Sequence, residues 1–150
     1  MKKNIFTFVI AAGLALAPSV LAAETREFSR LTVEVPDNWA ANEDDKTVYI
    51  VANDGSSIVS VMIDKFERDT AAKLAKEMAR QFKAEDARDL GNGNHAVNYI
   101  EPTTGKSAVA LISQRPGQEI MVITQIGDNE AADNIIGSLK PKDTKDSAGK

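Results

Sequence analysis

The chain has 150 residues, of which 43% are hydrophobic and 27% are charged, with a formal net charge of −4 and no cysteine. This length suffices for one domain with one hydrophobic core, and the acidic balance argues against nucleic acid, whose phosphates favour basic surfaces. The lack of cysteine excludes disulfides, thiol nucleophiles and cysteine-ligated zinc or iron–sulfur sites.

The first 23 residues have the three-part layout of a secretory signal peptide. Two lysines give a positive start, an apolar run extends from Ile5 to Ala17, and small residues follow Pro18 up to Ala22 and Ala23. The run is shorter than the roughly 20 residues of a membrane span. A lipid anchor is excluded, because it would need a cysteine and the chain has none. The remaining alternative is a buried N-terminal helix, which the lysine start disfavours. We therefore expect a cleaved bacterial export signal.

Cleavage is expected after Ala22 rather than after Ala23, because Val20 would fit the outer pocket of the peptidase better than Leu21. Removing residues 1–23 leaves 127 residues. It lowers the number of Lys and Arg from 18 to 16 against 22 acidic residues, so the mature net charge is −6. The mature protein is expected in the periplasm or outside the cell, without a membrane anchor.

The N-terminal half of the mature chain predicts three strands. Leu31, Val33 and Val35 alternate with polar residues over 28–36, which indicates a half-buried strand. A turn at Pro36–Asn38 precedes Trp39, and the acidic segment from Ala40 to Lys46 is expected to be a loop. Two β-branched runs, 47–52 and 57–66, flank an Asp-Gly turn and predict an antiparallel hairpin.

A helix is predicted over 71–84, capped by Asp69 or Thr70. Its apolar stripe is expected to face a sheet and its basic residues to face solvent, with a partner-binding face as the alternative. The stripe comprises Ala71, Leu74, Ala75, Met78 and Phe82.

Three β-like segments follow, over 95–101, 107–114 and 119–126, joined by short links rich in turn residues. Such links permit antiparallel neighbours but not parallel crossovers. The last two segments are apolar at both parities, which predicts cover on both faces of the sheet.

A final helix is predicted over 129–139, capped by Asp128 and stopped by Pro141, and the polar residues 141–150 are expected to form a disordered tail. The order β-ββ-α-βββ-α predicts a single α+β domain over 24–140, around a mainly antiparallel sheet of about six strands.

Two short motifs resemble the DcrB-like periplasmic proteins and the wider PsbP-like group. The strand that runs into Val35-Pro36-Asp37-Asn38-Trp39 resembles their opening strand and Pro-x-x-Trp turn. The ending Ile135-Ile136-Gly137-Ser138-Leu139-Lys140 is similar to the end of their final helix.

This resemblance implies an α/β/α sandwich and non-enzymatic roles. Members of the group include extrinsic subunits of photosystem II, an adaptor of the small GTPase Ran and an envelope protein associated with phage entry. The resemblance supplies no catalytic residues. DcrB-like members are often lipoproteins, and this chain lacks the cysteine that would carry the lipid.

No catalytic site is predicted. His95 is the only histidine, and no Gly-x-Ser-x-Gly motif accompanies it. Gly105-Lys106-Ser107 matches the end of a P-loop but lacks the first glycine, because Ile100 stands there. Ser147 and Lys150 match a Ser-x-x-Lys spacing by chance.

Neither a metal nor a cofactor is predicted. One histidine leaves a zinc site short of ligands. The acidic clusters lack the Asp-x-Asp-x-Asp-Gly pattern of a calcium loop and are read as solvated loops and helix starts. These clusters lie at 43–45, 85–89 and 128–133.

Trp39 is the residue with two open interpretations: a core residue that closes one end of the sheet, or an exposed anchor for a partner. The leading functional hypothesis is a small soluble exported binding or accessory protein that contacts an envelope protein. The alternative is a module that binds a small molecule or an ion in a pocket near Trp39 and the segment 40–46. A small hydrolase is the third hypothesis, with its carboxylates drawn from distant strands.

Overall fold

The structure, a computed structural model, describes residues 22–143. The predicted signal segment up to residue 21 and most of the predicted tail, residues 144–150, lie outside the described residues. Ten strands and two helices occupy the described part, in the order β1–β5, α2, β6–β9, α3, β10. The α+β class is confirmed.

The strands form two antiparallel sheets rather than one sheet of six. The larger sheet has the order β3-β4-β5-β9-β8-β7-β6, and the smaller has the order β1-β2-β10. The larger sheet is built from β3 (Trp39–Asp44), β4 (Thr47–Ala52), β5 (Ile58–Lys65), β6 (Arg88–Gly91), β7 (Asn94–Ile100), β8 (Ser107–Arg115) and β9 (Glu119–Ile126). The smaller is built from β1 (Ala23–Glu27), β2 (Leu31–Pro36) and β10 (Lys140–Pro141).

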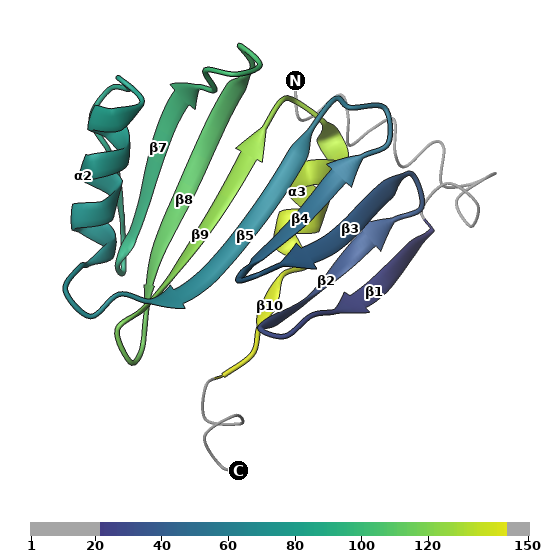
Figure 1. The fold of residues 1–150 in the computed structure, drawn as a ribbon, viewed down its shortest axis with the longest axis horizontal. Helices are drawn as coiled ribbons and strands as arrows, with labels where there is room; N and C mark the ends of the chain where they lie inside the picture. Colours follow the sequence, from purple (N-terminus) through teal and green to yellow (C-terminus); the bar gives the residue numbers. More distant parts are fainter. Residues whose placement is uncertain (1–21, 144–150) are drawn as a thin grey trace.

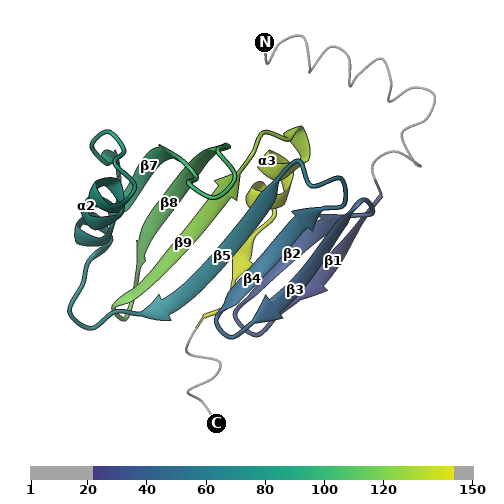
Figure 2. The same cartoon turned by 45° about the horizontal axis from the view of Figure 1, so that its top comes forward.

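The two helices pack on opposite faces of the larger sheet, α2 at one end of it and α3 behind its middle strands. Helix α2 (Ala71–Gln81) packs on β7 and β8, whereas α3 (Glu130–Gly137) packs on β5 and on β2 of the smaller sheet. Figures 1 and 2 show α2 beside β7 at one end of the sheet and α3 behind β5, next to the smaller sheet. We call the two faces of the larger sheet the α2 face and the α3 face.

The two faces carry separate hydrophobic cores. On the α3 face, alternate residues of β4 and β5 such as Ile50 and Val61 meet Leu31 of β2 and Ile135 of α3. On the α2 face, Val97, Ile112 and Ile120 meet three buried alanines of the helix. The described part of the chain therefore covers each face over only half of its width, which differs from the fully covered sandwich that the resemblance implies.

Several predicted elements are confirmed. The hairpin of β4 and β5 forms, and β7, β8 and β9 pair as antiparallel neighbours. Helix α2 is capped by Thr70, whose hydroxyl oxygen accepts a hydrogen bond from the Lys73 amide at 3.2 Å. Its buried stripe is Ala71, Ala75 and Ala79, with Leu74 and Met78 packed at its border. Phe82, just after the helix, stacks on Tyr99 of β7 with ring centroids 4.4 Å apart.

Other predictions are wrong in ways that have physical reasons. The segment 40–46 is not a loop, because it begins as β3, an edge strand paired with β4. Strands β1 and β6 were not predicted, since every residue but Arg26 in them is exposed. Asn129, not Asp128, caps α3, because its side chain accepts from the Ala131 amide. The chain also stays paired beyond residue 140, where β10 adds to β2.

Candidate functional site

The uncovered half of the α3 face carries a groove that runs beside α3. Its larger hollow, of about 740 Å³, lies over the end of β7, the start of β8 and the end of β9. It reaches the chain between α2 and β6. A smaller hollow of about 220 Å³ continues between β8, β9 and α3. Because Val109 and Gln125 line both hollows, they form one groove.

The floor of the groove is apolar. Val109, Leu111 and Ile123 project from the sheet, and Ile136 projects from α3. Val109 and Leu111 are only half-buried, although their neighbours Ala110 and Ile112 on the α2 face are fully buried. The prediction that β8 is covered on both faces therefore holds on the α2 face alone. On the other face, Val109 and Leu111 keep part of their apolar surface exposed within residues 22–143.

Charged side chains stand around this floor. Asp128 and Asp133 lie on the α3 side, and Glu85 and Asp86 lie on the opposite side with Lys83 and Arg88. Within residues 22–143, none of these six makes an ion pair. An apolar floor with free charges at its rim suits the binding of an amphipathic partner.

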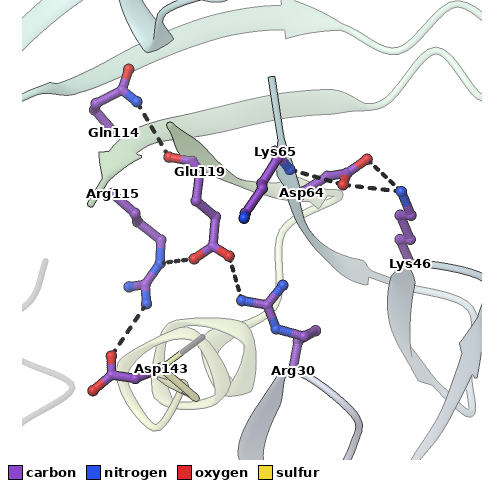
Figure 3. A network of polar contacts seen from close by, with 8 residues as sticks. All are labelled: Arg30, Lys46, Asp64, Lys65, Gln114, Arg115, Glu119 and Asp143. Carbon is purple, nitrogen blue, oxygen red and sulfur yellow. Dashed lines mark hydrogen bonds and ion pairs between the residues drawn. The ribbon is translucent and has the colours of Figure 1, made fainter. Parts of the chain in front are cut away.

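Within residues 22–143, the most buried charged group lies at the start of β9, at the end of this strand that is remote from the groove (Figure 3). Glu119 is 2% exposed, and its carboxylate accepts hydrogen bonds from Arg30 and, at 2.8 Å, from Arg115. Gln114 reaches the Glu119 carbonyl oxygen, at 3.3 Å, and the Ala71 amide, at 2.9 Å. Arg30 precedes β2, so this cluster ties the smaller sheet to the β8–β9 hairpin.

The cluster holds a paired ion rather than a reactive acid. Burial raises the pKa of Glu119, but the hydrogen bonds and charges of Arg115 and Arg30 outweigh burial and hold this pKa below its ordinary value of 4.5. The carboxylate is therefore ionised at neutral pH, with both oxygens occupied. Neither proton donation nor metal binding is favoured by this arrangement.

The structure places the residues that the sequence singled out in separate positions. Trp39 is 5% exposed in the core under the α3 face, and neither hollow is lined by it or by residues 40–46. His95 lies in β7 opposite Ile112. Lys106 donates from Nζ to the Gly55 carbonyl oxygen at 2.8 Å. Ala22 precedes β1, and Ala23 is its first residue.

The acidic clusters are likewise dispersed. The side chain of Glu43 accepts hydrogen bonds from Ser29, whereas Asp128 lines the groove. In the part of the chain that the structure describes, no group of three or more acidic or histidine side chains could hold a metal ion. The groove itself and the Glu119 cluster were missed by sequence reasoning. The apolar residues at both parities of β8 are the one sequence signal for this surface, and they predict cover without showing that part of the α3 face stays open.

Neither helix of residues 22–143 has the length and apolar composition needed to span a membrane. No protein-family model and no curated protein matches the chain. Among solved structures, it is similar to the crystal structure of a protein from Bacteroides thetaiotaomicron VPI-5482, with 12% identity and a TM-score of 0.49. The match covers 77% of this chain and 46% of that one, so the chain spans about half the length of that protein.

Proposed function

We propose that this protein is a small soluble exported protein of the bacterial envelope, without catalytic activity, that binds another envelope protein through the groove beside α3. The observation that carries the proposal is the half-open α3 face, where Val109 and Leu111 form an apolar floor bordered by free charges. A chain of this size gains little by leaving such a surface in water unless a partner covers it.

The signal-like segment supports the export part of this proposal. Cleavage after Ala22 would leave β1 whole, since β1 begins at Ala23, whereas cleavage after Ala23 would remove the residue that pairs with Pro36. The resemblance to DcrB-like and PsbP-like proteins stays a prediction and is consistent with a non-catalytic role. The paired state of Glu119 supports the same role, because it leaves no reactive acid there.

A small-molecule ligand is the second candidate. The larger hollow, of about 740 Å³, falls within the range of about 300–1,000 Å³ that ligand pockets occupy. The position differs from the one predicted, because Trp39 is a core residue and the hollow lies over β7, β8 and β9. If this second candidate holds, a pool of metabolites that contains the ligand should raise the melting temperature of the mature protein. Thermal unfolding with and without such pools measures the shift.

The protein-binding proposal is tested by placing a charge on the groove floor. Val109→Lys is expected to lower the amount of the bound envelope protein at least about tenfold, because the ammonium would have to be buried against apolar side chains. Asn42→Lys is the matched control, since Asn42 is an exposed strand residue on the α2 face. The measurement is quantitative mass spectrometry of proteins captured from an envelope extract by tagged mature protein.

Circular dichroism must show that both variants fold. Equal recovery of the same partners by Val109→Lys and by the native protein would contradict the proposal. So would crosslinked periplasm that yields only the free monomer.

A further inference from the structure

Strand β7 is longer than the edge strand that covers it. Strand β6 pairs with β7 only over Asn94 to Ala96, and the register shifts between Asp89 and Gly91. The remaining residues of β7, up to Ile100, pair with β8 on one side, and no strand of residues 22–143 lies on the other. The part of β7 from Val97 to Ile100 is therefore an open edge of the larger sheet.

The hydrogen-bond pattern shows which backbone groups meet this open edge. Just outside the two ends of β7, the Gly93 carbonyl oxygen accepts from the Gln114 amide of β8, and the Glu101 amide donates to the carbonyl oxygen of Lys106, which precedes β8. Antiparallel pairs alternate along a ladder, so the odd-numbered residues of β7 bond to β8 and the even-numbered residues point away from it. Asn98 and Ile100 thus direct their N–H and C=O groups outward. Within residues 22–143, no protein group bonds to them.

There is room beside this edge. The larger hollow is lined on one side by Asn98, Tyr99 and Ile100 and on the other by the chain from Lys83 to Asp86. The chain that leaves α2 therefore stands off from β7 until β6 begins at Arg88. The Ile100 side chain is 59% exposed at this place. Edge strands are commonly protected by Lys or Pro, and β7 contains neither.

We propose that an extended segment of a partner polypeptide adds to the larger sheet beside β7 and bonds to the backbone of Asn98 and Ile100. The occupant is a polypeptide strand, because the free donors and acceptors repeat at the two-residue period of a β-ladder. An apolar side chain of that segment would pack against Ile100 and extend toward Val109 in the groove. This inference rests on the proposed protein-binding function and names the binding mode.

The test uses short peptides selected by the mature protein from a displayed random library. Two N-methylated versions of a selected peptide are made, one blocked at odd and one at even positions. Strand addition predicts that one version binds at least about tenfold more weakly and the other binds nearly as well, because alternate amides face the sheet. The amide signals of Asn98 and Ile100 are expected to shift on binding.

Substitution at Asn98 supplies the matched pair on the protein side. Asn98→Pro removes the outward N–H and is expected to weaken binding about tenfold, whereas Asn98→Ala keeps that N–H and should stay within about twofold. If Asn98→Pro does not fold, the N-methylated peptides still decide. Failure to select any peptide, or equal binding by both N-methylated versions, would overturn strand addition. If Val109→Lys loses binding and Asn98→Pro does not, strand addition is also overturned, but the groove remains the binding site.

Discussion

Replacing Gly127 with alanine is expected to lower the free energy of unfolding by about 3 kcal/mol or more. Gly127 follows β9 with φ at +84°, a left-handed conformation that side chains disfavour. A Cβ there would lie 2.1 Å from the carbonyl oxygen of Ser56 and 3.2 Å from the Ser57 Cα. The Gly127 amide also donates to the Ser107 carbonyl oxygen at 2.9 Å, so the backbone cannot move away without breaking that bond.

Gly55→Ala is the matched control for this prediction. Gly55 has nearly the same backbone angle, φ +76°, but nothing lies within 4 Å of an added Cβ. Its substitution should therefore cost only the strain of the left-handed conformation, about 1 kcal/mol. Urea unfolding followed by circular dichroism measures both losses. Similar losses for the two variants would mean that the close contact with Ser56 does not limit the fold.

Glu119→Gln is expected to destabilise the protein by about 2–3 kcal/mol at neutral pH. The glutamine keeps the shape of the side chain but leaves Arg30 and Arg115 without their shared anion. The loss stays below that of a fully buried ion pair, because the two arginine side chains are 27% and 19% exposed and retain some hydration. The loosened contact is the one that joins the smaller sheet to the β8–β9 hairpin.

The pH dependence of this prediction has a definite sign. Because the pKa of Glu119 is lower in the folded protein than its ordinary 4.5, its contribution is fully present above that value and is lost as the pH falls through the folded pKa. The difference in unfolding free energy between the native protein and Glu119→Gln should therefore shrink in acid. Urea unfolding at a series of pH values measures it.

Asp64→Asn provides the control for Glu119→Gln. Lys46 and Asp64 also form an ion pair, at 3.0 Å, but their side chains are 57% and 32% exposed. Solvent screening should limit the loss there to less than about 1 kcal/mol. If the Asp64 variant lost as much stability as the Glu119 variant, burial would not distinguish the two pairs (Figure 3).

Sequence patterns predicted the elements that bury a continuous apolar face. The hairpin of β4 and β5 and the strands β8 and β9 have dense β-branched residues, and their turns set the register. Helix α2 was indicated by its cap and apolar stripe, although it ends at Gln81 because Lys83 takes a positive φ of 54°. These features are local, so a single sequence contains them.

The features that were missed depend on contacts between distant segments. Strand β3 has no large apolar residue apart from Trp39, so its Ala40–Asp44 stretch resembles a loop, yet it pairs along its length with β4. The chain changes sheet at Asp37, which no local pattern indicates. Glu119 is buried by Arg30, 89 residues away. The groove exists because α2 and α3 each cover half of a face, and this follows only from the tertiary arrangement.

Export is the premise on which the proposed function depends, and the N-terminal residue of the protein isolated from its own cells tests it most directly. Intact-mass measurement and N-terminal sequencing of the periplasmic or secreted fraction are expected to give a chain that begins at Ala23, the first residue of β1. A start at Glu24 would keep the export hypothesis and move the cleavage site by one residue. A chain that begins at Met1 and stays with the cytoplasmic proteins would contradict it.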